Sequence, residues 1–200
     1  HTPENAQWKT GAVGIGSSEA CMLGGVAAWL RWRERRRQEG KPFDKPNLIM
    51  SSAYQVVWEK FCQLWQIEMR TVPITRRHPT LDIEKAIEMC DENTICIVPI
   101  AGVTWTGMND DIEGLNDALE IYNKKTGYNI PIHVDAASGG FILPFLNPDK
   151  KWDFRLKWVL SISTSGHKYG LVYPGLGWVI WRDKKYLPGD MAFSVNYLGA

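Results

Sequence analysis

Two kinds of hydrophobic pattern alternate along the chain and predict strands separated by helices. Short apolar runs bounded by turn residues are typical of buried strands, whereas apolar residues three or four positions apart are typical of amphipathic helices. The predicted strands are 47–51, 67–72, 94–101, 130–134 with Asp135 at its end, 158–163 and 176–181. The predicted helices are 18–39, 55–66, a short helix capped by Asp82, and 112–126, which Gly127 closes.

Repeated strand–helix units of this length indicate one α/β domain, a mostly parallel sheet flanked by helices. Ligands of such sheets bind at the carboxyl ends of the strands. Four clusters of small and polar residues are predicted at that edge: GIGSSEA (14–20), AGVTWTG (101–107), DAASGG (135–140) and SGHKYG (165–170). Their shared position is stronger evidence for a site than any one cluster.

Composition and charge limit the classes of function that this chain could have. The 200 residues are 44% hydrophobic and 22% charged, which is typical of a globular domain. A net charge of +1 argues against a polyanion binder, and no apolar run approaches the roughly 20 residues of a membrane helix. The basic stretch 31–41 (RWRERRRQEGK) is interrupted by glutamates, so we expect a solvated helix face or a subunit contact.

The four cysteines show neither a CxxC pair nor a Cys/His cluster, so the sequence predicts no metal site. Their apolar neighbours predict buried free thiols in a reducing compartment.

Residues 14–20 place Ser17 and Ser18 after two glycines at the start of a predicted helix. Free backbone N–H groups and the helix dipole favour an anion there, and the hydroxyls add donors. The stretch lacks the Gly-Lys-Ser/Thr of a nucleotide-binding loop and the full dinucleotide fingerprint. Taken alone, ordinary helix capping by serine explains it better.

Asp135 ends an apolar strand and is followed by five small residues. Small residues let a flat ligand approach the backbone, and a buried carboxylate needs a cationic partner or several donors. A protonated pyridine nitrogen would be such a partner. Capping of the next turn by Asp135 explains the stretch about as well.

Lys168 lies between two apolar strands, within SGHKYG. An amine that loses solvation there is favoured in its neutral form, which can attack an aldehyde and form a Schiff base. A surface lysine in a Gly-rich loop is the simpler interpretation of any single lysine. His167 is a phosphate donor, a ring contact or a structural histidine, and Gln55 opens a helix at the same edge.

Together, these clusters offer an anion cradle, a carboxylate for a ring nitrogen, an amine for an aldehyde, and room for a planar ring. Pyridoxal 5'-phosphate has the complementary parts, and the sequence therefore predicts it as the cofactor.

Five ordered motifs, GSSEACMLGG, DKPNL, CDENT, HVDAASGGF and SISTSGHKYG, resemble those of pyridoxal-phosphate-dependent glutamate decarboxylases, in the group II decarboxylase family. The resemblance continues through GWVIWRD and NYLGA and so covers essentially the whole chain. It implies a large domain of the aspartate-aminotransferase type, with a mostly parallel seven-stranded sheet. It also implies that residues 1–200 form most of this cofactor domain, without the family's N-terminal segment and small C-terminal domain.

The resemblance implies a role for each site residue. Lys168 matches the lysine that bonds to the cofactor aldehyde, and Asp135 matches the partner of the pyridine nitrogen; both are candidate catalytic residues. The other cofactor contacts that it implies are Ser17, Ser18, Ser165 and His167 at the phosphate, Gln55 and Ala137 on the two ring faces, and Thr104 beside the ring.

The implied activity is the decarboxylation of L-glutamate to 4-aminobutyrate and carbon dioxide. The implied protein is a cytoplasmic homodimer or higher homo-oligomer that binds neither nucleic acid nor a membrane. Two alternatives stay open: another pyridoxal-phosphate-dependent decarboxylase of the same group, and a truncated, non-catalytic domain of this fold. A dehydrogenase is excluded because no dinucleotide fingerprint opens a strand–helix unit.

Overall fold

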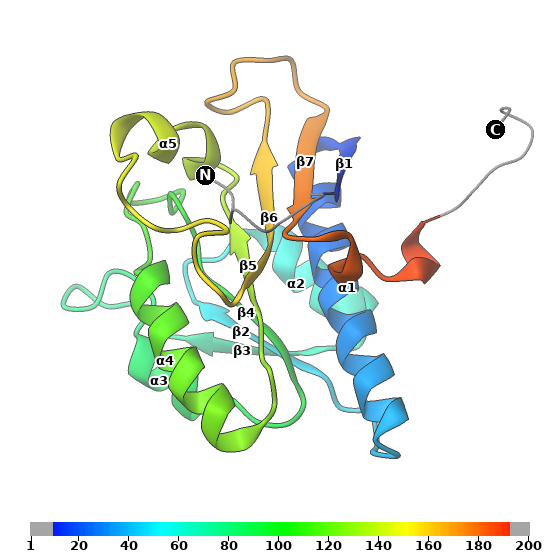
Figure 1. Ribbon diagram of the computed structural model, residues 1–200. Helices are drawn as coiled ribbons and strands as arrows, with labels where there is room; N and C mark the ends of the chain where they lie inside the picture. Colours follow the sequence, from blue (N-terminus) through cyan, green and yellow to red (C-terminus); the bar gives the residue numbers. More distant parts are fainter. Residues whose placement is uncertain (1–9, 193–200) are drawn as a thin grey trace, which may run out of the picture.

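The computed structural model describes residues 10–192, whose strands form one seven-stranded sheet in the order β1-β7-β6-β5-β4-β2-β3 (Figure 1). The NYLGA motif lies outside the described residues. The strands are β1 (Thr10–Ile15), β2 (Asn47–Ser51), β3 (Glu68–Val72), β4 (Thr94–Val98), β5 (Ile132–Asp135), β6 (Val159–Ser165) and β7 (Leu176–Trp181). The helices are α1 (Gly16–Gln38), α2 (Val56–Leu64), α3 (Ile83–Glu88), α4 (Ile112–Thr126) and α5 (Leu143–Leu146), with short 3₁₀ turns at Gly139–Phe141, Lys184–Tyr186 and Gly189–Met191.

The predicted α/β class and mostly parallel sheet are confirmed. Strands β3, β2, β4, β5 and β6 pair in parallel, whereas β7 runs antiparallel to both β6 and β1. Strand β1 was not predicted. Its sequence, TGAVGI, has two glycines and little bulk, and it is ordered by pairing with β7, near the other end of the chain.

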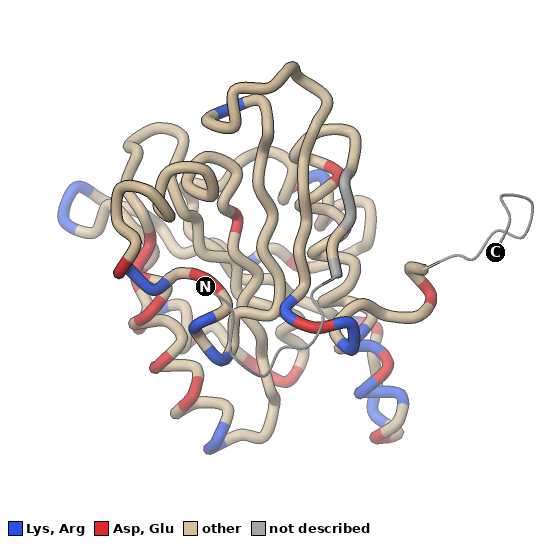
Figure 2. Tube along the Cα trace, turned by 45° about the horizontal axis from the view of Figure 1, so that its top comes forward, with Lys and Arg blue, Asp and Glu red and all other residues tan. Residues whose placement is uncertain are grey.

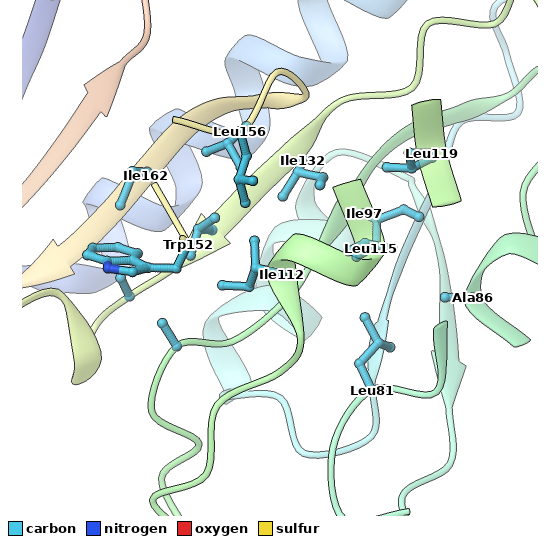
Figure 3. Close-up of a cluster of buried hydrophobic side chains, with 14 of the residues drawn as sticks. Leu81, Ala86, Ile97, Ile112, Leu115, Leu119, Ile132, Trp152, Leu156 and Ile162 are labelled. Atoms are coloured by element: carbon cyan, nitrogen blue, oxygen red, sulfur yellow. The ribbon is translucent and has the colours of Figure 1, made fainter. Parts of the chain in front are cut away.

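Helices cover both faces of the sheet (Figure 1). Leu48 and Met50 of β2 pack in a cluster with α1 and α2, whereas Ile49 packs with α3 and α4 on the other face. Figure 3 shows part of this second cluster, in which Leu115 and Leu119 of α4 lie close to Ile97 of β4. Central strands buried on both faces explain their uninterrupted apolar runs.

The basic half of α1 differs from its prediction. Arg36 is only 4% exposed and forms an ion pair with Glu92 at 3.3 Å. Arg31 donates to the backbone carbonyl of Tyr186. A solvated face is therefore wrong for these two arginines, which connect the second half of α1 to the 3₁₀ turn Lys184–Tyr186 and to Glu92. Figure 2 shows acidic positions interspersed among the basic ones along this half of the helix.

The four cysteines are buried free thiols, as predicted. None of the helices within residues 10–192 combines the length and apolar character that a membrane crossing needs.

Candidate active site

A cavity of about 270 Å³ lies where β5 and β6 end and α1 begins. Among the predicted site residues, those that line it are Ser17, Ser18, Gln55, Asp135, Ala137, His167 and Lys168. Thr104 lines a smaller adjoining pocket that shares Gln55, Asp135, Ala137 and Lys168. Ser165, the last residue of β6, is fully buried and lines neither.

The first turn of α1 forms one wall of the cavity. Gly16 has φ +81°, a left-handed conformation that favours glycine, and it turns the chain from β1 directly into the helix. Ile15 occupies the cap position with no side-chain cap, and its N–H donates to the carboxylate of Glu19. Helix capping by serine is therefore wrong. The hydroxyls of Ser17 and Ser18 remain available at the positive end of the helix dipole.

Asp135 is 3% exposed, and each of its oxygens accepts one hydrogen bond. The indole Nε1 of Trp58 donates to Oδ2 at 2.8 Å, and the backbone N–H of Ala137 donates to Oδ1 at 3.1 Å. The second bond is the turn cap that was the alternative interpretation of Asp135, and that interpretation is confirmed. A carboxylate accepts about four hydrogen bonds, and these two leave capacity for a protonated ring nitrogen.

A buried polar network lies below Asp135. The two ring nitrogens of His133 contact the hydroxyls of Ser161 at 2.7 Å and Ser163 at 3.1 Å. Ser163 also lies 3.3 Å from the thiol of Cys21. Burial lowers the pKa of His133 to about 3. Burial, with a smaller contribution from the Asp135 carboxylate, raises the pKa of the Cys21 thiol well above its usual range, so this thiol is a poor nucleophile.

Lys168 lies in the loop of residues 166–175 between β6 and β7. The N–H of Gly166 donates to the carbonyl of Leu176 at 2.9 Å, which keeps the ends of the loop together. A Cβ at Gly170 would lie 2.5 Å from the carbonyl oxygen of Gly166, so only glycine fits there. The partly buried Lys168 amine lies 3.5 Å from the hydroxyl of Ser138.

Gln55 and Thr104 lie at the rim of the site. Gln55 caps α2, and its side-chain oxygen accepts from the N–H of Val57 at 2.6 Å. Thr104 is exposed, in a loop whose base is held by Asp110. The buried Asp110 carboxylate accepts from the N–H groups of Ile100 at 2.7 Å and Leu81 at 2.8 Å.

Two unpaired polar atoms support an anion near the loop. Ser165 Oγ and His167 Nδ1 are buried and have no hydrogen-bond partner within the described part of the chain. Such groups cost free energy unless a ligand or water satisfies them. Together with the serines of α1, they fit a phosphate group; Asp135 and Lys168 fit a pyridine nitrogen and an aldehyde.

Sequence reasoning missed three residues at the site: Trp58, Ser138 and Cys21. Trp58 follows Gln55 by three positions, so helical spacing alone places it one turn further along α2, facing the sheet. Ser138 was noted only as one of several small residues, and nothing in its sequence context indicates a contact with Lys168.

A larger cavity, of about 390 Å³, lies at the amino ends of the strands, opposite the carboxyl ends where the candidate site lies. It is lined by residues at the amino ends of the strands, such as Thr94 and Trp158, and by Arg31 and Arg35 of α1. None of the predicted site residues lines it.

The chain is similar in sequence and in fold to known proteins. The chain is 58% identical to a glutamate decarboxylase of Lactococcus lactis subsp. cremoris over 191 residues, which are 94% of this chain and 41% of the relative. It is 55% identical to glutamate decarboxylase beta of Listeria monocytogenes over 201 residues, 100% of this chain and 43% of the relative. The solved glutamate decarboxylase of Lactobacillus brevis superposes with a TM-score of 0.94 at 51% identity, over 98% of this chain and 45% of that structure.

The chain thus spans 41–45% of the length of these relatives. Residues 1–200 match the conserved domain of pyridoxal-dependent decarboxylases along their whole length. The large-domain fold that the motifs implied is the fold of the solved Lactobacillus brevis glutamate decarboxylase. The chain belongs to the pyridoxal-dependent decarboxylase family.

Proposed function

We propose that this chain is the cofactor-binding part of an L-glutamate decarboxylase, which forms 4-aminobutyrate and carbon dioxide. One observation carries the proposal: a single cavity gathers the Lys168 amine, the Asp135 carboxylate and the first turn of α1. The identity of 51–58% with glutamate decarboxylases favours glutamate over the other amino-acid substrates of the group.

Each residue that lines the cavity would have its own role in the reaction. Bound pyridoxal phosphate would supply an electron sink for the electron pair left at Cα when carbon dioxide departs. Lys168 would hold the aldehyde carbon through Nζ and, after the substrate amine replaces it, would hold a proton beside Ser138. Asp135 would keep a proton on the ring nitrogen. Each role is a proposal for these side chains, and it rests on their positions at the cavity.

The remaining residues would bind the phosphate of the cofactor and orient its ring. Ser17 and Ser18 would donate to the phosphate at the amino end of α1. Ser165 would donate to it from the end of β6, and His167 from the loop that follows. Gln55 and Ala137 would flank the ring, with Thr104 at its rim. A fixed ring orientation matters because the bond that breaks must align with the ring's electron system.

We also propose that the protein is a homo-oligomer. Ile15, which lines the cavity, is 84% exposed, and two apolar side chains of the loop that carries Lys168 are exposed as well, Leu171 at 89% and Tyr173 at 92%. A second copy of the chain would bury them. Light scattering of the purified protein tests this proposal, and a Leu171→Ser, Tyr173→Ser double variant should weaken assembly. A monomeric wild type would contradict it.

We propose a cytoplasmic location. Four buried free thiols suit a reducing compartment. Cell fractionation with an antibody to the protein tests this location, and recovery from an extracellular or oxidising compartment would contradict it.

The activity test uses the longest natural polypeptide that contains this chain. Purified protein is supplied with pyridoxal phosphate and a panel of L-glutamate, L-aspartate and aromatic amino acids, and released carbon dioxide is measured. The proposal predicts turnover with L-glutamate and formation of 4-aminobutyrate. Turnover only with another amino acid would favour a different decarboxylase of the group. Cofactor binding without turnover of any of them would favour a non-catalytic domain.

A further inference from the structure

We propose that Trp58 is a positioning residue that orients the Asp135 carboxylate toward the cofactor ring. The inference rests on the proposed cofactor site. Trp58 is fully buried and does not line the cavity, so it would act on a bound ring indirectly, and we propose that it acts through its hydrogen bond to Asp135.

The contact between the two residues is direct. The indole Nε1 donates to Asp135 Oδ2 at 2.8 Å, and this is a charge-assisted bond in a buried setting. The only other bond to this carboxylate within the described residues comes from Ala137 N–H, on the other oxygen. Trp58 is therefore the side chain that determines how the carboxylate is rotated about its last torsion.

Trp58 is itself tightly held. Its ring packs edge-on against His133, with centroids 5.3 Å apart, and against Phe61, with centroids 6.0 Å apart. His133 is fixed in turn by the hydroxyls of Ser161 and Ser163. A ring fixed in this way keeps its N–H direction without any help from solvent.

The placement also joins two parts of the site. Gln55 caps α2 at the rim of the cavity, and Trp58 lies one turn further along the same helix, below Asp135. A single rigid helix thus fixes a side chain proposed to flank the ring and the donor that aims the carboxylate. Movement of α2 would displace both together.

The chemistry favours an N–H donor at this position. A buried carboxylate needs hydrogen-bond donors to replace the water that it has lost. The indole donates but cannot accept a proton, so it supports the ionised carboxylate without competing for its charge.

The test uses the longest natural polypeptide that contains this chain. Trp58→Phe removes the N–H and keeps an aromatic ring, whereas Trp58→His restores a ring N–H. Trp65→Phe is the control on the same helix, because Trp65 caps the end of α2 and its ring lies tilted against that of Phe61, with centroids 5.2 Å apart. The readouts are the dissociation constant for pyridoxal phosphate and the visible circular dichroism of the bound cofactor. Each variant is also combined with Asp135→Ala.

We expect Trp58→Phe to weaken cofactor binding by about tenfold or more, the effect of one hydrogen bond to a charged group, and to reduce the dichroism. Trp58→His should recover part of both, and Trp65→Phe should change neither by more than about twofold. With Asp135→Ala present, Trp58→Phe should add no further loss. If Trp58→Phe does not fold, Trp58→His is measured with and without Asp135→Ala instead. Its loss of cofactor affinity should then appear only when Asp135 is present.

Equal losses from Trp58→Phe with and without Asp135 would overturn the proposal, because they would indicate packing alone. A loss below about twofold would overturn it as well. If the wild type binds no pyridoxal phosphate, the proposed function fails first, which is a distinct result.

Discussion

Lys168 and Asp135 line one cavity from the ends of two neighbouring parallel strands. Asp135 is the last residue of β5, and Lys168 follows the end of β6 by three positions. The strands pair so that Asp135 lies opposite Ser163. Because parallel strands end at the same edge, an amine and a carboxylate that are distant in sequence reach the same space.

Replacement of Asp135 by Asn should separate cofactor binding from turnover. The amide keeps the size of the side chain but carries no charge to hold a proton on the ring nitrogen. We expect the cofactor still to bind, with reduced affinity, and carbon dioxide release from glutamate at saturating cofactor to fall by about 100-fold or more. Asp149→Asn, at an exposed position, is the control. Unchanged turnover in Asp135→Asn would contradict the electron-sink role.

Ser138 should matter modestly through Lys168. Its hydroxyl lies 3.5 Å from the lysine amine, at the long limit for a hydrogen bond. We expect Ser138→Ala to bind the cofactor and to lower kcat by about 2- to 10-fold, the effect of one ordinary hydrogen bond. Ser138→Thr, which keeps the hydroxyl, should retain more activity than Ser138→Ala. Equal kcat values for the two variants would rule out a role for the hydroxyl.

Local sequence determined much of this fold. Asp82 caps α3 as predicted, and α4 runs from Ile112 to Thr126 with Gly127 closing it at φ +74°. These features depend on neighbours within a few residues, so the sequence pattern contains them. The carboxyl-edge clusters were predictable for a related reason, because strand ends in a parallel sheet share an edge.

Contacts between distant segments were not predictable. Trp58 and Asp135 are 77 positions apart, and the pattern around each contains no trace of the other. Strand β1 depends on β7 in the same way. The cap of α1 was predicted wrongly for a different reason. Serines at the start of a helix are usually caps, but here Gly16 turns the chain so that Ile15 takes the cap position.

His133 should make the fold sensitive to acid. Its pKa is lowered from 6.5 to about 3, so the unfolded chain binds a proton below pH 6.5 that the folded chain does not. The stabilisation is therefore present above pH 6.5 and is lost as the pH falls toward 3. Between pH 7 and pH 4, His133 should account for a loss of about 3 kcal/mol in the free energy of unfolding.

Urea unfolding of the wild type and His133→Gln at pH 7 and pH 4 measures this loss. The wild type should lose more stability on acidification than His133→Gln does. His78→Gln, at an exposed histidine, should behave as the wild type does. The same pH dependence in His133→Gln and the wild type would contradict the assignment.

Gly24 of α1 should not tolerate a side chain. A Cβ there would lie 2.2 Å from the His133 ring, which two hydroxyls hold in place. Overpacking costs about 1–3 kcal/mol, more than the up to about 1 kcal/mol that alanine gains over glycine in a helix. Gly24→Ala should therefore lower the urea midpoint, whereas Gly189→Ala, with no atom within 4 Å of its Cβ, should not. A Gly24→Ala protein as stable as the wild type would show that His133 can move.

The most direct measurement asks which residue bonds to the cofactor. The wild type and Lys168→Ala, each in the longest natural polypeptide that contains this chain, are incubated with pyridoxal phosphate, reduced with borohydride and digested, and the peptides are identified by mass spectrometry. The account predicts that the wild type carries the reduced cofactor on Lys168. In Lys168→Ala, no lysine should carry it. A wild-type adduct on a different lysine, or an undiminished adduct in Lys168→Ala, would contradict it.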